Sequence, residues 1–246
     1  MPAEPGGDDG TPWSLAPIAR IHSCFTEQFG IPRQPGLVTK SVGTMEMLPP
    51  FDRPEMFAGL DQFSHIWIHF LFHATIAEGW RSTVRPPWLG GQKRVGVFAS
   101  RSPHRPNFLG LSVVRLVAIR TCDKKIFLDL EGIDVLDQTP VFDIKPYLPY
   151  SDSVAGTTGS GYTTEKREPV EVRFSDQAMV FSLSYQRVSG RDLLGLMRQI
   201  LRQDPRPPSQ KGNGRAFGMM LWDVNIRWQV RQEGFYVVSC ERVTAG

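Results

Sequence analysis

Hydrophobic residues in the first 150 positions fall into short runs separated by Pro- and Gly-rich segments. Residues 63–73 are apolar, aromatic and β-branched, which is typical of a buried strand. Further runs predict strands over residues 15–21, 95–99, 111–119, 125–131 and 141–144. Many short strands with Gly/Pro turns, and no convincing long helix among them, predict a mainly β protein built on a small β-barrel.

The hydrophobic pattern changes towards the C-terminus. Between residues 190 and 202 the apolar side chains fall on one stripe, which predicts a helix that Ser189 and Asp192 would cap. Residues 221–231 alternate between apolar and polar side chains, which predicts a half-buried strand, and residues 235–240 complete a hairpin. This part of the chain therefore predicts a smaller α+β C-terminal domain.

Local composition indicates where the domains begin and end. Residues 1–11 are rich in Gly, Pro and Asp, which predicts a disordered tail without the features of a signal peptide. We expect the β-barrel domain in residues 12–150, a linker or mobile loop in the Ser-, Gly- and Thr-rich residues 151–167, and the C-terminal domain in residues 168–246. No apolar run approaches the length of a membrane span, so we expect no membrane partner.

Charge and cysteine content narrow the class of protein only slightly. The chain carries 28 Lys and Arg residues against 25 Asp and Glu residues, a net charge of +3. This balance does not identify a nucleic-acid-binding protein, but it permits one if the basic side chains cluster. The 3 cysteines are odd in number and widely spaced, which predicts no disulfide framework and a reducing, cytoplasmic location.

Three histidines raise the question of a metal site. His65, His69 and His73 are spaced four residues apart, which on a helix would form one metal-binding face. The residues around them predict a strand instead, where neighbours in the series lie ~13 Å apart at ~3.3 Å per residue. No single ion can bind two of them at that distance, so we expect no metal.

One loop combines a stiff backbone with cationic side chains. In GVFASRSPHRPNFLG, residues 96–110, two X-Pro steps bias the backbone towards extended conformations around Arg101 and Arg105. Two guanidiniums on a rigid loop suit a phosphate or carboxylate ligand. The alternative is a surface loop whose arginines pair with nearby acids, and the pattern alone leaves both open.

Basic residues are dense on both sides of the Pro/Gly-rich loop at residues 86–91. They form either a solvated surface or a set of phosphate contacts for RNA. The polar face of the strand expected over residues 221–231 is likewise either solvated or in contact with RNA. The candidates for RNA contact are Arg81, Arg85, Lys93, Arg94, Arg105, Arg227 and Arg231.

No glycine-rich dinucleotide fingerprint follows a predicted strand, so a Rossmann-type methyltransferase is not indicated. The loop at residues 96–110 nevertheless resembles the signature of the TsaA/TrmO family, tRNA methyltransferases that use S-adenosylmethionine. Further segments match that family in order along the chain: IPRQPGLV, GLDQFSHIWIHFLFH, TVRPPWLGG, TPVFDIKPYLPYSDS, DPRP and LWDVNIRWQV. The chain departs from the family at Phe108, where a proline is common, and at Gln138, where a glycine is common.

The resemblance implies a β-barrel catalytic domain, a smaller C-terminal domain and a homodimer. It implies an enzyme that methylates N6 of threonylcarbamoyl-adenosine at position 37 of threonine tRNA, so the expected partner is the anticodon stem-loop and the expected cofactor is S-adenosylmethionine. The cofactor contacts that the resemblance implies are Pro32, Arg33, Gln34, His73, Ala74, Arg101, Leu111, Ile133 and Asp134.

Methyl transfer from a sulfonium is an in-line displacement in which positioning contributes much of the catalysis, and a base for the N6 proton would help. No carboxylate stands out by spacing. The catalytic candidates are Asp134, Asp143, Lys145 and Tyr147. We interpret His104 as a shape or stacking residue. The alternative class is a barrel that binds the cofactor or RNA without catalysis, for which cofactor binding without methyl transfer would be the sign.

Overall fold

The computed structural model of the 246-residue chain describes residues 13–86, 93–157, 170–206, 216–232 and 234–243. The tail expected over residues 1–11 lies outside the described residues, as do residues 158–167 of the expected linker. The described part of that linker overlaps a short helix, α1 (Pro149–Asp152).

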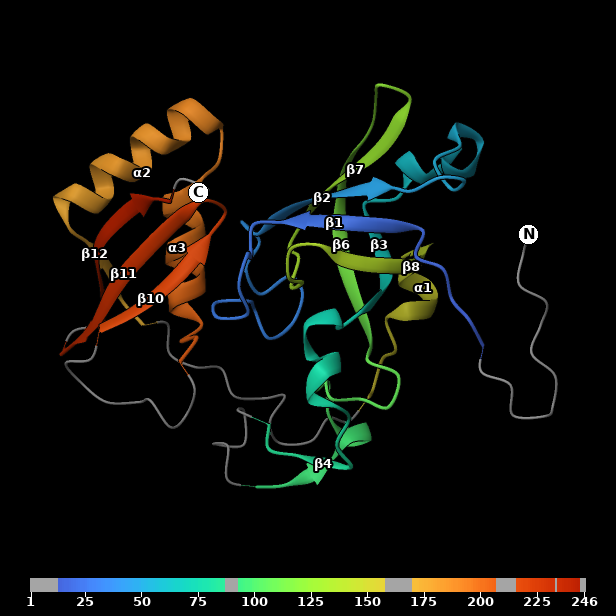
Figure 1. The fold of residues 1–246 in the computed structure, drawn as a ribbon, viewed down its shortest axis with the longest axis horizontal. Helices are drawn as coiled ribbons and strands as arrows, with labels where there is room; N and C mark the ends of the chain where they lie inside the picture. The colour runs from blue at the N-terminus through green and yellow to red at the C-terminus, as the bar shows by residue number, and fades with distance from the viewer. Residues whose placement is uncertain (1–12, 87–92, 158–169, 207–215, 233, 244–246) are drawn as a thin grey trace.

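A closed antiparallel barrel occupies the N-terminal part of the chain (Figure 1). Its strand order is β1-β2-β7-β6-β3-β8, and β1 pairs with β8 to close the sheet. The strands are β1 (Ala19–Ser23), β2 (Val42–Met47), β3 (His65–Leu71), β6 (Leu109–Cys122), β7 (Lys125–Glu131) and β8 (Thr139–Pro146). The mainly β architecture and the barrel that the hydrophobic runs predict are therefore confirmed.

Strand β3 shows how the sequence fills this barrel. Ile66, Ile68 and Phe70 are buried, and the side chains between them are more exposed. Successive side chains of a strand point to opposite faces, so one set packs the interior and the other covers the outer wall. Because side chains fill the interior of a small barrel, a ligand has to bind at its ends or on its wall.

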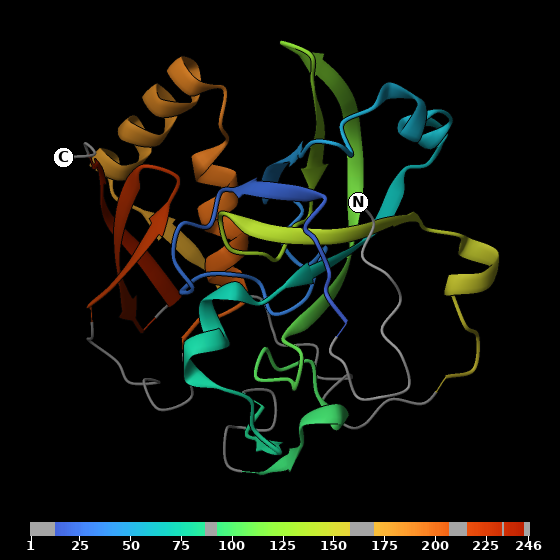
Figure 2. The same ribbon diagram turned by 45° about the vertical axis from the view of Figure 1, so that its right-hand side comes forward.

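The segment between β3 and β6 extends beyond one end of the barrel (Figure 2). It comprises the 3-10 helix η3 (His73–Glu78), the hairpin of β4 (Thr83–Val84) with β5 (Val95–Gly96), and the 3-10 helix η5 (Val97–Ala99). Two more 3-10 helices, η1 (Pro54–Phe57) and η2 (Leu60–Gln62), precede β3.

Two of the expected strands are shorter in the structure. The one expected over residues 95–99 stops at Gly96, because the chain turns into a 3-10 helix at Val97. The one expected over residues 15–21 starts only at Ala19. Pro17 precedes it, and a proline has no N–H to donate to a sheet.

The C-terminal part is a four-stranded sheet with two helices. The strand order is β10-β11-β12-β9, and only the β12–β9 pair is parallel. The elements are β9 (Val172–Phe174), α2 (Asp176–Ser189), α3 (Leu193–Arg202), β10 (Ala216–Leu221), β11 (Val224–Arg231) and β12 (Gly234–Arg242). The expected α+β domain, its helix near residue 200 and its final hairpin are confirmed.

The helix α2 has no counterpart in the sequence predictions. Its buried residues are Ala178, Ser182 and Tyr185, while Val180 and Leu183 face solvent, so no apolar stripe marks the helix. Its presence also corrects the capping prediction, because Ser189 is the last residue of α2. Asp192 caps α3 alone, with Oδ1 accepting from the Gly195 N–H at 2.9 Å.

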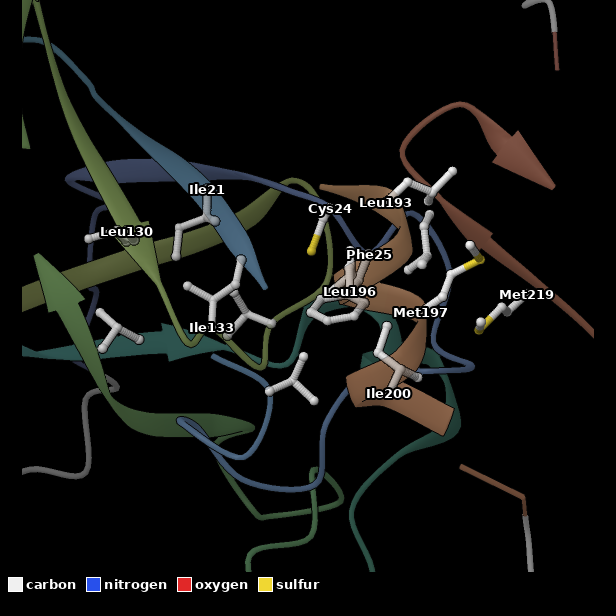
Figure 3. Close-up of a cluster of buried hydrophobic side chains, with 14 of the residues drawn as sticks. Ile21, Cys24, Phe25, Leu130, Ile133, Leu193, Leu196, Met197, Ile200 and Met219 are labelled. Carbon is white, nitrogen blue, oxygen red and sulfur yellow. The ribbon is translucent and has the colours of Figure 1, made fainter. Parts of the chain in front are cut away.

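The barrel and the C-terminal part share one hydrophobic core. Figure 3 shows α3 between the barrel strands and β10, with Leu196 and Ile200 pointing towards Phe25 and Met219 on the side of the sheet. Phe25 is fully buried and forms a bridge with Leu221. Burial is continuous across the junction, so the two parts stabilise one another.

Within the described parts of the chain, no helix is long and apolar enough to cross a membrane. The same residues contain no cluster of three His, Cys, Asp or Glu side chains that could hold a metal ion.

Candidate active site

A cavity of about 550 Å³ lies where the segment after β3 meets the barrel. Its walls come from the loop around Pro32, the start of η3, the loop at residues 100–105, the start of β6 and the turn after β7. Of the expected cofactor residues, Pro32, Arg33, Gln34, His73, Ala74, Arg101, Leu111 and Asp134 line this cavity. Four stretches far apart in the sequence, within residues 28–34, 70–75, 100–112 and 134–139, thus converge on one space.

Ile133 is the expected cofactor residue that does not line the cavity. Its side chain is fully buried and points into the core near Ile21 (Figure 3). Its carbonyl accepts from the Ser41 hydroxyl at 2.7 Å. Ile133 therefore anchors the turn that presents Asp134.

Arg101 joins two of the converging loops. Its guanidinium donates to Gln34 Oε1 at 2.5 Å, across 67 positions of sequence. Arg101 is an exposed residue and lines the cavity, where its guanidinium can bind a carboxylate or phosphate.

Asp134 is the carboxylate of the cavity. Its Oδ1 accepts from the Ser112 hydroxyl at 2.6 Å, and Ser112 itself is buried in β6. Burial raises the pKa of the Asp134 carboxyl to about 6, although the Ser112 hydrogen bond and the charge of Arg101 both favour the ionised form. The site therefore holds an anion at neutral pH that can accept a hydrogen bond from an ammonium or hydroxyl group.

His73 supplies an unmatched polar atom. Its Nδ1 is buried and has no hydrogen-bond partner among the described residues. A buried polar atom without a partner costs about 1–3 kcal/mol, so this nitrogen is suited to a ligand in the cavity.

The apolar wall of the cavity depends on one glycine. A Cβ at Gly110 would lie 2.4 Å from the ring of Phe70, which itself packs edge-on against Phe72. Without that glycine, the ring would have to move. Apolar walls with a few convergent polar groups are the usual form of a small-molecule site.

Arg105 has a different environment from Arg101. Its Nη1 donates to the carbonyl of Ser100 at 2.7 Å and to that of Val97 at 3.3 Å, and its guanidinium lies 5.8 Å from the Phe98 ring centroid. These bonds hold the loop at residues 97–105 in shape. His104 accepts from the Arg81 N–H through its carbonyl, so it too ties this loop to the preceding segment.

The other basic candidates lie away from the cavity lining. Arg81 pairs with Glu78, and Arg94 donates to Thr83 Oγ1. Arg85 and Lys93 are exposed beside the β4–β5 hairpin. Arg227 and Arg231 are exposed on β11 of the C-terminal sheet, where Arg231 stacks 3.5 Å from the Tyr236 ring centroid.

The remaining catalytic candidates lie on the outer wall of the barrel. Asp143 and Lys145 contact each other and stand in register with His69 and Trp67 of β3. The Tyr147 ring follows at the end of β8, 5.9 Å from the Trp67 ring. Asp143, Lys145 and Tyr147 do not line the 550 Å³ cavity.

Several residues of the site were not predicted from the sequence. Ser112, Phe70 and Gly110 look like ordinary strand residues, since a strand pattern does not reveal which of its residues face a cavity. Gln138, which departs from the family, adopts φ = 65°, a left-handed conformation that glycine adopts readily.

Comparison with known proteins agrees with this arrangement. The domain described as tRNA-methyltransferase O N-terminal domain matches residues 20–153, and the TrmO C-terminal domain matches residues 167–243. The tRNA (adenine(37)-N6)-methyltransferase of Escherichia coli is 40% identical over 226 residues, covering 91% of this chain and 96% of that protein. RcsF of Pseudomonas aeruginosa, whose name refers to S-adenosylmethionine-dependent methyl transfer, is 46% identical over 216 residues, covering 87% and 91%.

A solved structure is also similar. The crystal structure of TrmO from Pseudomonas aeruginosa superposes with a TM-score of 0.78 at 39% identity, covering 94% of this chain and all of that one. The resemblance drawn from the segments around residues 31–38, 59–73 and 96–110 is thereby confirmed.

Proposed function

Since the chain belongs to the tRNA-methyltransferase O family and is an S-adenosylmethionine-dependent tRNA (adenine37-N6)-methyltransferase, we propose that its substrate is the threonylcarbamoyl form of that adenine in threonine tRNA. The observation that supports the methyl-transfer chemistry of this proposal most is the cavity of about 550 Å³. Segments chosen from the family resemblance, and widely separated in sequence, meet around one space of cofactor size.

The residues of the cavity fit S-adenosylmethionine. Arg101 would hold the carboxylate of the cofactor, Asp134 its ammonium or a ribose hydroxyl, and the buried Nδ1 of His73 a further polar group. Phe70 and Leu111 would cover its apolar surface. When bound, the cofactor supplies a methyl group on a sulfonium.

The chain also has to handle a proton, because N6 carries one before methylation and the product does not. Asp134 and Asp143 are the carboxylates proposed to accept it. Lys145 forms an ion pair with Asp143, and the Tyr147 ring packs beside Trp67 on the same wall. Positioning of N6 by these side chains would contribute most of the remaining rate.

The proposal extends to partners and location. The anticodon stem-loop would bind across the loops that carry Arg81, Arg85, Lys93 and Arg94, with Arg227 and Arg231 adding phosphate contacts. The enzyme would act as a homodimer in the cytoplasm. Light scattering that finds a monomer at micromolar concentration would contradict the dimer.

Mass spectrometry of tRNA nucleosides tests the substrate. Threonine tRNA that carries threonylcarbamoyl-adenosine is incubated with the protein and S-adenosylmethionine, beside the same transcript lacking the modification. We expect a mass gain of one methyl group on the modified nucleoside only. Equal methylation of plain adenosine would overturn the proposed substrate but not the methyltransferase activity.

A further inference from the structure

A second cavity, of about 450 Å³, lies on the outer wall of the barrel next to the first. Its lining comes from β3, β6, the end of β8 and the helix α1. The residues around it are Pro35, His65, Trp67, Arg101, Leu111, Val113, Tyr147 and Asp152. Nothing in the cofactor arrangement uses this space.

The two cavities meet at a shared boundary. Arg101 and Leu111 line both of them, and Pro35 of the second follows Gln34 of the first. The hydrogen bond from Arg101 to Gln34 joins two loops at this boundary. Methyl transfer needs donor and acceptor in line and in contact, so an acceptor must bind beside the cofactor cavity at such a boundary.

The second cavity has an aromatic surface held in a fixed orientation. The rings of Trp67 and Tyr147 lie 5.9 Å apart at an interplanar angle of 47°. The Trp67 indole N–H donates to Asp152 Oδ2 at 2.8 Å, and the same oxygen accepts from the Leu148 N–H at 2.9 Å. Asp152 therefore fixes the tryptophan ring against the turn that leads into α1.

We propose that this second cavity binds the target adenine, with Trp67 and Tyr147 as the surfaces on which the base stacks and Asp152 as the positioning residue for Trp67. The proposal rests on the proposed function and names the acceptor site for it. Unpaired bases of RNA loops are recognised largely by stacking on aromatic side chains. A cavity of this size also suits a nucleoside with an acyl substituent.

The charges around the cavity favour RNA over a second copy of the chain. Arg101 lines it, and Lys145, in register with Trp67, keeps 60% of its side chain exposed although its ammonium pairs with Asp143. Cationic groups suit a phosphodiester or a threonyl carboxylate, whereas Lys and Asp side chains, such as Lys145 and Asp152 here, are depleted at protein–protein interfaces.

Substitution of the tryptophan tests the proposal. Base–aromatic stacking energies correspond to a roughly 10- to 100-fold loss of affinity on truncation, so Trp67→Ala should weaken binding of the modified anticodon stem-loop by that factor. Trp67→Phe should retain most of the affinity, since it keeps an aromatic face. Calorimetry should find S-adenosylmethionine binding unchanged within about two-fold in both variants, because Trp67 does not line the first cavity.

A nearby tyrosine provides the matched control. Tyr150 lies on α1, is 87% exposed and lines neither cavity, so Tyr150→Ala should leave RNA and cofactor binding unchanged. Stem-loop affinity that is equal for Trp67→Ala and wild type would overturn the proposal. So would a loss that appears only together with a lower molecular mass in light scattering, which would make this wall a contact between copies. Failure of the wild-type protein to methylate any tRNA would overturn the proposed function instead.

Discussion

Single residues of the cavity that we propose for the cofactor have roles that can be separated by measurement. Arg101 is the clearest, because its guanidinium both bonds Gln34 and faces the cavity. Arg101→Ala should weaken S-adenosylmethionine binding by about 1.5–3 kcal/mol, the range for a hydrogen bond to a charged group. Calorimetry measures this directly. Arg115→Ala, which removes an exposed arginine of β6 that pairs with Glu131, should have no effect on cofactor affinity.

Asp134 should make the free energy of unfolding fall as the pH rises, the reverse of the usual effect of a carboxylate. Its folded pKa of about 6 lies above the unfolded value near 4. Its stabilising contribution is therefore fully present below pH 4 and is lost as the pH rises through 6. The side chain in Asp134→Asn stays neutral at all these pH values. Relative to wild type, the free energy of unfolding of the variant should therefore increase by on the order of 2 kcal/mol as the pH rises from 4 to 7.5.

Urea unfolding of both proteins at several pH values checks this sign. Parallel stability curves for wild type and variant would mean that the carboxyl titrates as it does in the unfolded chain. The same variant should bind S-adenosylmethionine less tightly at pH 7.5, because the anion in the cavity is lost.

At the scale of elements, the arginines of the segment between β3 and β6 are of two kinds. Arg105 holds carbonyls of its own loop, whereas Arg85 is exposed at the β4–β5 hairpin. Arg105→Ala should lower the melting temperature and weaken cofactor binding. Arg85→Ala should leave both unchanged but reduce the slope of log affinity for tRNA against log salt by about 0.7, the value for one phosphate contact. An unchanged slope would remove Arg85 from the RNA surface.

Elements with a strong period could be predicted from the sequence, and those without one could not. The strand β3 and the helix α3 have clean apolar patterns. The strand β10 escaped because Trp222, read as part of the following strand, sits in the turn between β10 and β11 with φ = 52°. A tryptophan gives no turn signal, so the pattern beginning at Leu221 merged two elements.

The residues of the candidate site also divide into those that could be predicted from the sequence and those that could not. Arg101 and its proline-stiffened loop could be predicted as a candidate anion site. The family resemblance placed Gln34 in the same site, and only the structure shows the hydrogen bond between the two side chains. Trp67 lay in a strand with no sign that its outer face borders a cavity. Asp152 fell in the stretch interpreted as a linker. Contacts that join distant segments leave no local pattern in the sequence.

At the scale of the whole molecule, the shared core should make unfolding cooperative. Phe25 is fully buried between the barrel and α3. Phe25→Ala should lower the free energy of unfolding by about 3–5 kcal/mol and leave a single transition. Met56→Ala, at a side chain that is largely exposed, should change it by less than about 0.5 kcal/mol. Two separate transitions in the wild-type protein would contradict the shared core.

The junction between the barrel and the C-terminal sheet also covers the edge of β10. The barrel closes on itself, but β10 is the outermost strand of an open sheet. On its outer side the Met220 N–H donates to Glu27 Oε1 at 2.8 Å, and just beyond it the Trp222 N–H donates to the Cys24 carbonyl at 2.9 Å. Unpaired edges recruit strands from other molecules. The segment at residues 24–27 thus covers the edge of β10 and opposes aggregation. Removing it would leave β10 free to pair with a strand of another chain.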